Sequence, residues 1–282
     1  MIFTILGIVL CTIVVLQFGF WTAQSWTRMA YQRRQYDRSL ELLGSQIELA
    51  VAQRQQLQAA SRRPRWQGYR DFRVERIEPE CKDCKSIYLV PVDGKPLAEF
   101  RPGQHLAIRL QIEGHAKPLV RCYSLSDLPA ESHYRITVKV VPSDPQDPDS
   151  SPGKVSDYLN RQLEVGDLLE AKAPTGSFYL EQESERPIVL LAGGVGITPM
   201  ISMIRQLLQE NSTRLVVLVY GVRNGQSHPF KEFLADAAEH HANLHVVTAY
   251  SAPQPNDRQG RDYQVSGHVT TERLHQLLPH LD

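Results

Sequence analysis

The segment Pro187-Ile-Val-Leu-Leu-Ala-Gly-Gly-Val-Gly-Ile-Thr-Pro-Met-Ile-Ser-Met-Ile204 decides the fold of this chain. The apolar run from Ile188 to Leu191 predicts a buried strand, the glycines predict a sharp loop, and Pro199 predicts the first turn of a helix. Glycine allows a ligand to approach the backbone closely, and free N–H groups at a helix start favour an anion. The Gly-Gly-x-Gly pattern is shorter than the full G-x-G-x-x-G spacing, so a tight turn without a ligand also fits it.

Further strands and a helix follow this segment. Leu215 to Tyr220 and Leu244 to Tyr250 are apolar runs of strand length, and Pro229 to Glu239 between them has helical spacing. Alternation of strand and helix indicates a parallel sheet with helices on both faces. We therefore expect an α/β nucleotide-binding domain over residues 185–282, with its ligand at the carboxyl ends of the strands.

The preceding residues, 66–184, have a different pattern. Short β-type runs follow one another with turn sequences such as Asp93-Gly94 and Pro102-Gly103 between them. This density of strands predicts a small antiparallel β-barrel. The runs are Phe72–Ile77, Ser86–Pro91, Gln104–Ile112, Val120–Leu125 and Tyr134–Val141.

Two motifs of this segment carry groups suited to a phosphorylated aromatic ligand. Strand alternation sends Arg121 and Tyr123 to one face. The guanidinium fork suits a phosphate, and the phenol ring can stack on a flat ring system. Downstream, Gly153 and Ser156 occupy a predicted helix start, which is a second anion site. Taken alone, Arg121 and Tyr123 would also fit an ordinary exposed pair on a strand.

Four motifs in this order give the chain a specific resemblance. Arg121-x-Tyr-Ser124, Gly153-x-x-Ser156, Pro174-x-Gly-x-Phe178 and Gly193-Gly-Val-Gly-Ile-Thr-Pro199 resemble the signatures of the ferredoxin–NADP reductase-like flavoprotein superfamily. Within it, they are most similar to the reductase modules of flavohaemoglobins and of oxygenase reductases. The resemblance covers about residues 68–282. It implies an FAD-binding barrel over residues 66–184, an NAD(P)-binding domain over residues 185–282, and FAD and NAD(P)H as cofactors.

The resemblance also assigns roles to individual residues. Arg121 would hold the FAD pyrophosphate, Tyr123 would stack on the isoalloxazine, and Ser124 would hydrogen-bond near flavin N5. Tyr123, Ser124 and Thr198 are the catalytic candidates, with Thr198 near the nicotinamide. The other cofactor-binding candidates are Thr137, Val138, Lys139, Gly153, Lys154, Val155, Ser156, Gly193, Gly194, Gly196, Pro199 and Arg223.

Arg223 bears on the choice of nucleotide. It ends the second predicted strand of the nucleotide domain, where the family often contacts the adenosine ribose. An arginine there could pair with a 2′-phosphate and favour NADPH. It could equally be a solvated side chain, or stack on adenine in an NADH enzyme, so both nucleotides stay open.

The chain departs from the superfamily after Val265–Leu278. The superfamily has a further strand ending in Cys-Gly-Pro and a final helix, whereas this sequence ends at Asp282. We therefore expect a nucleotide domain truncated at its C-terminus, which leaves hydride transfer by this exact chain open. The sequence also has no Cys-x4-Cys-x2-Cys ferredoxin pattern.

The first 65 residues predict a membrane anchor and a stalk. Ile2 to Trp21 contain no ionisable side chain, and this run is long enough for a transmembrane helix over residues 1–22. A cleaved signal peptide, the alternative, needs a basic start that this sequence lacks. Arginines follow the span, so the positive-inside rule places the globular part in the cytoplasm. Residues 23–65 predict a helical stalk whose narrow apolar stripe allows a homodimer, or packing against the membrane or the globular part.

Composition limits the other possibilities. The 31 basic and 31 acidic side chains among 282 residues give no support for nucleic-acid binding. Four cysteines are too few for a disulfide scaffold. Cys81-Lys-Asp-Cys84 fits a loop with inert thiols, half a zinc site or a redox pair, but no second pair completes a metal site. We expect no bound metal, and we expect Cys122 to pack in the core.

Together these features predict a membrane-anchored flavoprotein reductase. It would pass electrons from NAD(P)H through FAD to a one-electron acceptor, which would be a ferredoxin-type 2Fe–2S or haem protein or domain. The alternative is a non-catalytic membrane-tethered scaffold derived from a truncated reductase.

Overall fold

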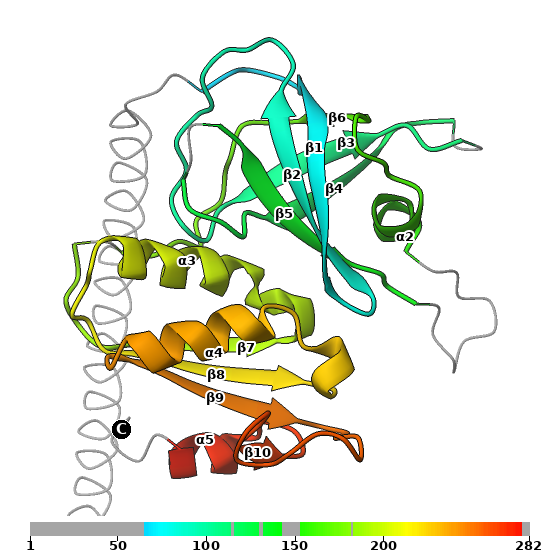
Figure 1. Ribbon diagram of the computed structural model, residues 1–282. Helices are drawn as coiled ribbons and strands as arrows, with labels where there is room; N and C mark the ends of the chain where they lie inside the picture. The colour runs from blue at the N-terminus through cyan, green and yellow to red at the C-terminus, as the bar shows by residue number, and fades with distance from the viewer. Residues whose placement is uncertain (1–64, 114–115, 130–131, 143–152, 182, 278–282) are drawn as a thin grey trace, which may run out of the picture. The chain divides into compact units, whose positions relative to one another are not determined.

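The computed structural model describes residues 65–113, 116–129, 132–142, 153–181 and 183–277. Residues 65–181, here called the barrel, contain a six-stranded antiparallel sheet in the order β4-β3-β6-β1-β2-β5 (Figure 1). The strands are β1 (Arg70–Cys81), β2 (Cys84–Pro91), β3 (His105–Leu110), β4 (Leu119–Ser124), β5 (Tyr134–Lys139) and β6 (Leu168–Ala171). The five strands expected from the sequence are confirmed, and β6 is an additional one.

Contacts between the two edge strands close this sheet. Leu125, directly after β4, forms a bridge with Ile136 of β5, and the N–H of Ser126 donates to the carbonyl of Arg135 at 2.9 Å. Alternate strand residues such as Phe72 and Ile108 fill the interior and are fully buried. Apolar residues that alternate along the strands therefore point into the barrel, and the residues between them point outward, as expected for a barrel.

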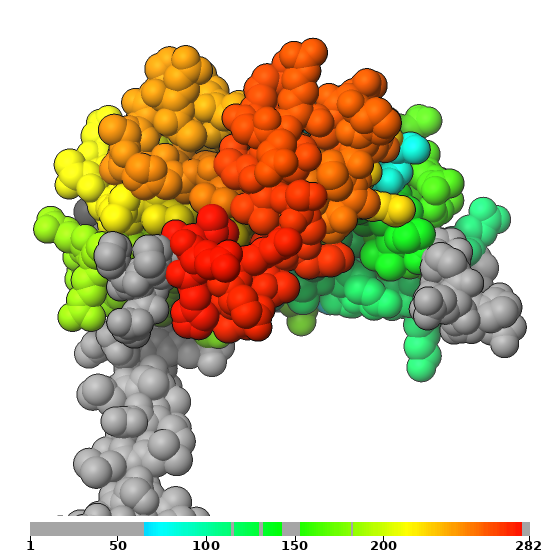
Figure 2. Space-filling model, turned by 90° about the horizontal axis from the view of Figure 1, so that it is seen from below, coloured from blue at the N-terminus to red at the C-terminus, as the bar shows by residue number. Residues whose placement is uncertain are grey.

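Residues 183–277, here called the α/β part, contain a four-stranded parallel sheet in the order β10-β9-β8-β7. The strands are β7 (Ile188–Gly193), β8 (Val216–Val222), β9 (Leu244–Tyr250) and β10 (Val265–Ser266). The helices are η1 (Gly194–Ile197), α3 (Thr198–Gln209), η2 (Gly225–Ser227), α4 (Lys231–His240) and α5 (Thr271–Leu277). Figure 2 shows the segment that follows β9, which includes α5 and is coloured orange to red, on one face of this part.

Both long helices of the α/β part pack on the same face of its sheet. Ile201 and Ile204 of α3 and Leu234 of α4 join one core cluster with the alternate strand residues Leu218 and Tyr220. The strand order runs steadily from β7 to β10, so right-handed crossovers place both helices on one side. The two long helices expected from the sequence therefore share one face of the sheet.

Strand β7 is an edge strand of the described sheet. Leu190 faces the helices and is buried, whereas Leu191 on the opposite face is 50% exposed. The apolar run therefore predicts the strand correctly, but only the face of the strand that packs against the helices is buried.

The barrel and the α/β part belong to one compact unit, residues 62–282. The Ser202 hydroxyl of α3 donates to the carbonyl of Asp127 in the barrel at 2.7 Å. The N–H of Lys82, at the tip of the β1–β2 hairpin, donates to the carbonyl of Gln226 in η2 at 3.1 Å. Hydrogen bonds thus join the two parts at several separate places.

The predicted anchor, residues 1–22, lies outside the described residues. The predicted stalk, residues 23–65, does so as well except for Arg65. None of the helices in the described ranges combines the length and the apolar character that a membrane span requires.

Candidate functional site

Strand β4 carries the first group of candidate residues, on the face that it shares with buried Leu106 and Ile108 of β3. Arg121 is exposed, and Tyr123 is half-buried against the barrel core. Burial raises the pKa of Tyr123 to about 12, and the nearby charge of Arg121 opposes this shift. The two residues lie on the same face of β4, so that face offers a guanidinium and a phenol ring that is neutral at neutral pH.

Ser124 ends β4 and is half-buried opposite His105 of β3. Cys122, between Arg121 and Tyr123, is exposed. The expectation that Cys122 packs in the core is wrong, because it points to the outer side of the sheet opposite Ala107. The buried core residues of β3 lie opposite Arg121 and Tyr123 instead.

The three candidates on β5 have different surroundings. The Val138 side chain lies in the barrel core, and its carbonyl accepts a hydrogen bond from Asn160 Nδ2 at 2.7 Å. Lys139 is half-buried at the end of the strand. Thr137 is buried on the other face, where its hydroxyl lies 2.7 Å from Ser126 Oγ. Neither Val138 nor Thr137 presents a side chain to solvent.

Thr137 belongs to a row of hydroxyl groups that the sequence did not predict. Its Oγ1 also lies 2.9 Å from Ser86 Oγ, which donates to Glu80 Oε1 at 2.5 Å. Burial raises the pKa of Glu80 above its usual value, although the bond from Ser86 and the charge of Arg135 oppose the shift. The row joins Ser126, in the segment after β4, to a half-buried carboxyl group on β1.

The helix α2 (Lys154–Arg161) begins at Gly153. The Ser156 hydroxyl donates to the carbonyl of Gly153 at 2.8 Å and lies 3.3 Å from the N–H of Val141. A Cβ on residue 153 would lie 2.7 Å from Ser156 Oγ, so a larger residue there would displace this hydroxyl. Lys154 is exposed and Val155 packs in the barrel core. Ser156 therefore shapes the helix start, and no side chain of the described residues caps it.

The glycine loop lies at the carboxyl end of β7. Gly194 has a φ of +51°, a conformation that favours glycine, and its carbonyl accepts a hydrogen bond from the Tyr220 hydroxyl at 3.0 Å. A Cβ at Gly193, Gly194 or Gly196 would meet no atom within 4 Å. The surface of the loop is thus open, and buried Tyr220 holds it from β8.

Helix α3 starts directly after this loop. Thr198 is its first residue and is buried, and its hydroxyl donates to the carbonyl of Val195 at 3.1 Å. Pro199 stands in the first turn, where its missing N–H breaks no hydrogen bond. The strand, glycine loop and helix start expected from the sequence are confirmed.

Arg223 lies at the carboxyl end of β8 and is exposed. Its carbonyl accepts a hydrogen bond from the N–H of Ala252 at 2.8 Å. The guanidinium is therefore at the same edge of the sheet as the glycine loop, because β7 and β8 run parallel.

Asp127 lies between the β4 motif and α3 and pairs with arginines from both parts, and no sequence pattern predicted this role. Its carboxylate lies 3.4 Å from Arg135 Nε and 3.7 Å from Arg205 Nε of α3. Burial raises the pKa of Asp127, but the hydrogen bond from His133 and the two arginine charges outweigh it and keep this pKa below its usual value. The one available signal in the sequence was position, since Asp127 lies three residues after the Arg121-x-Tyr-Ser124 motif.

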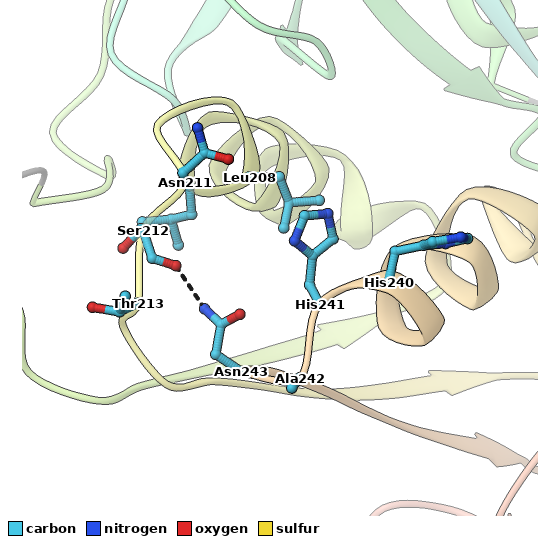
Figure 3. A pocket seen from close by; sticks show the side chains of 9 residues that line it. Leu208, Asn211, Ser212, Thr213, His240, His241, Ala242 and Asn243 are labelled. Atoms are coloured by element: carbon cyan, nitrogen blue, oxygen red, sulfur yellow. Dashed lines mark hydrogen bonds between the residues drawn. The ribbon is translucent and has the colours of Figure 1, made fainter.

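A hollow of about 320 Å³ lies elsewhere in the α/β part (Figure 3). It lies where α3 and α4 end and β8 and β9 begin, and Asn243 Nδ2 donates to the carbonyl of Ser212 there at 2.8 Å. The glycine loop lies at the opposite edge of the sheet, so this hollow is not part of the candidate site.

Comparison with known proteins agrees with this division. Residues 72–179 match the family model of the oxidoreductase FAD-binding domain, and residues 190–280 match that of the oxidoreductase NAD-binding domain. The solved FAD/NAD-binding domain of nitric oxide dioxygenase from Vibrio cholerae is 30% identical with a TM-score of 0.61, over 72% of this chain and 80% of that one. The chain belongs to the FAD- and NAD-binding oxidoreductases. FAD and NAD(P)H are the cofactors of this oxidoreductase.

The oxidoreductase is also similar to curated flavohemoproteins. That of Halalkalibacterium halodurans is 40% identical over 213 residues, which are 76% of this chain and 51% of the relative. That of Rhizobium meliloti is 39% identical over 209 residues, or 74% and 51%. The chain thus spans about half the length of these relatives. Phthalate dioxygenase reductase, 24% identical with a TM-score of 0.55 over 76% of this chain and 65% of that one, shares the fold.

The residues of this oxidoreductase fit both cofactors. For FAD, the barrel offers an exposed guanidinium beside an aromatic ring on β4 and an uncapped helix start at α2. For the nicotinamide nucleotide, it offers the open glycine loop before α3. Arg121 and the start of α2 would bind phosphates, Tyr123 would contact the flavin ring, and residues 193–198 would hold the nucleotide pyrophosphate.

Proposed function

We propose that this chain is the reductase part of a membrane-anchored electron-transfer flavoprotein. In this role FAD accepts hydride from NAD(P)H and releases electrons to a one-electron acceptor. The acceptor is a haem or 2Fe–2S protein or domain. The similarity to flavohemoproteins supports haem, and the electron transfer to [2Fe–2S] named for phthalate dioxygenase reductase supports the second choice.

One observation carries the proposal most directly. Asp127 follows the β4 motif, and α3 follows the glycine loop. The hydroxyl of Ser202 in α3 donates to the carbonyl of Asp127 at 2.7 Å. Elements that would bind the two cofactors are thereby fixed to one another. Catalysis between two bound cofactors depends on such fixed distance and orientation.

The chain's own residues would divide the remaining tasks. Tyr123, neutral at working pH, would cover one face of the flavin and exclude water from it. The row Ser126–Thr137–Ser86–Glu80 can hold a proton and move it along hydroxyl groups. Thr198, whose hydroxyl already donates to Val195, would orient the nicotinamide through its position in the helix start.

Nucleotide-driven reduction of ferricyanide tests the proposal and the choice of nucleotide. We expect turnover by the purified chain with NADH or NADPH. If Arg223 binds a 2′-phosphate, Arg223→Ala raises the KM for NADPH about tenfold or more and leaves that for NADH unchanged. A flavin-loaded chain without turnover on either nucleotide would support the non-catalytic scaffold instead.

Fractionation tests the anchor and the cytoplasmic orientation. The apolar run Ile2–Trp21 and the arginines after it support both. We expect the full chain to resist extraction from membranes at alkaline pH, and a variant without residues 1–22 to be released. The globular part should be protease-sensitive only when the cytoplasmic side is exposed. Release of the full chain would refute the anchor, and protection of the globular part in cytoplasm-exposed vesicles would refute the orientation.

A further inference from the structure

Cys81 and Cys84 lie directly opposite each other at the end of the β1–β2 hairpin. Cys81 ends β1, Cys84 begins β2, and the register pairs the two residues across the two-residue turn Lys82–Asp83. The sequence left open a loop with inert thiols, half a zinc site and a redox pair. The register favours the redox pair, because it brings the thiols together.

The hairpin geometry suits a disulfide. Directly opposed residues of antiparallel strands have Cα atoms about 4.5 to 5.5 Å apart. Disulfides form at Cα separations of about 4.4 to 6.8 Å. The register places the two side chains on the same face of the hairpin. The pairing of the two residues is therefore compatible with a disulfide.

The turn is held from three sides. The carbonyl of Asp83 accepts hydrogen bonds from the N–H of Val140 at 2.9 Å and from Asn160 Nδ2 at 3.4 Å. The N–H of Lys82 donates to Gln226. These contacts keep the two strand ends in register, so the thiols face each other before any reaction.

The two thiols differ in the way that thiol–disulfide exchange requires. Cys81 is half-buried, and the hydrogen bond from Cys84, opposed by burial, lowers the pKa of Cys81 to about 7. Cys84 is fully buried, and its bond to Cys81 together with burial raises its pKa well above the usual value. Cys81 thus provides a thiolate at neutral pH, and Cys84 provides a protected second thiol.

A metal does not explain the pair within the described residues. In these ranges, no group of three or more His, Cys, Asp or Glu side chains is placed to hold a metal ion. Cys122 is on β4, a strand that neither β1 nor β2 pairs with.

We propose that Cys81 and Cys84 form a reversible dithiol–disulfide couple whose oxidant is a low-molecular-weight disulfide. The Cys81 thiolate attacks one sulfur of that disulfide and releases the other half as a thiolate. Cys84 then gives up its proton and attacks Cys81 Sγ, which releases the second half as a thiol. One small disulfide is reduced to two thiols, and the hairpin gains one disulfide.

Peptide mapping of the full-length protein tests this couple, with oxidised glutathione as the probe. Trypsin cleaves after Arg76, Lys82 and Lys85, so a disulfide leaves the peptides 77–82 and 83–85 joined. We expect this joined species after oxidation of a Cys122→Ser protein at pH 7, and its loss on treatment with dithiothreitol. In the reduced protein, alkylation of Cys81 should be at least about tenfold faster than that of Cys84.

Single substitutions separate the two roles. Cys84→Ser should accumulate a mixed disulfide between Cys81 and glutathione, whereas Cys81→Ser should leave Cys84 reduced. Near-UV circular dichroism verifies that each variant is folded. Absence of the joined peptides in folded Cys122→Ser protein, or equal alkylation of the two thiols, would overturn the couple. The assay measures thiols alone, so its result is independent of reductase activity.

Discussion

Arg121 and Tyr123 lie two residues apart on one face of β4 and differ in burial. The exposed guanidinium can reach a phosphate, while the half-buried ring presents a flat surface anchored on the barrel core. A charged donor to phosphate contributes more free energy than a neutral hydrogen bond, about 1.5 to 3 kcal/mol. Most of the affinity for the FAD phosphates on β4 should therefore depend on Arg121.

Replacement of Arg121 tests this assignment. We expect Arg121→Ala to weaken FAD binding about 10- to 100-fold, with Arg121→Lys between this variant and the wild type, because lysine keeps the charge but loses the fork. Fluorescence titration of the apoprotein with FAD measures the dissociation constant. Equal FAD affinity in all three proteins would place the phosphates elsewhere.

His228 makes stability depend on pH. It is buried against Tyr220 and Tyr250, and burial, helped by the charge of Lys231, lowers its pKa to about 4. An unfolded histidine titrates near 6.5, so below that pH the unfolded chain binds more protons and the folded state loses stability. Between pH 6.5 and 5 this loss is about 2 kcal/mol.

Urea unfolding at several pH values measures this loss. We expect His228→Gln to flatten the fall of the unfolding free energy between pH 6.5 and 5. Exposed His245 on β9 provides the control, since His245→Gln should keep the wild-type slope. A wild-type slope in His228→Gln would show that other groups cause the dependence.

At the scale of elements, the strand–loop–helix segment from β7 to α3 shows what sequence predicts well. Its glycines, its apolar run and Pro199 act locally, so their pattern determined the conformation. Burial of the same strand depends on neighbours that no local pattern encodes, and Leu191 is exposed. The packing of α3 and α4 on the same face of the sheet is likewise not encoded locally, because it depends on the order of the strands.

The same distinction holds for the site on the barrel. Alternation correctly placed Arg121 and Tyr123 on one face. It misjudged Cys122, because the core of the barrel lies on the side of Arg121 and Tyr123 and Cys122 points the other way. The role of Ser156 at a phosphate stays a prediction, and in the structure its hydroxyl donates to the carbonyl of Gly153. The hydroxyl row through Thr137 joins three strands and could not be found without the register.

Gly194→Ala tests the open surface of the glycine loop. Gly194 and Gly94 both have positive φ, +51° and +66°, and an added Cβ meets no atom within 4 Å at either. Each alanine should therefore cost about 1 to 2 kcal/mol in unfolding free energy. Only Gly194→Ala places a methyl group where the nucleotide would approach, so it should raise the nucleotide KM about tenfold.

Gly94→Ala is the matched control because it introduces the same backbone strain at a position outside the nucleotide-binding loop. Its KM should equal that of the wild type at a similar loss of stability. If both variants change KM equally, strain and not contact with the nucleotide explains the effect.

At the scale of the whole molecule, Asp127 links the barrel to α3. Asp127→Asn keeps the shape but removes the negative charge beside Arg135, which is 4% exposed, and Arg205. We expect a loss of about 3 kcal/mol in the free energy of unfolding, measured with urea. Asp93→Asn removes the charge of a carboxylate that is 39% exposed beside Arg70, and it should change stability less. Equal effects of the two substitutions would contradict a structural role for the junction.

The central claim is that one chain binds FAD and a nicotinamide nucleotide close enough for hydride transfer. Anaerobic titration of the FAD-loaded protein with NADH and with NADPH, followed by visible absorbance, tests it most directly. We predict that at least one nucleotide bleaches the flavin band with one equivalent per flavin. A protein that does not take up FAD, or bound flavin that stays oxidised with excess of both nucleotides, would contradict the claim.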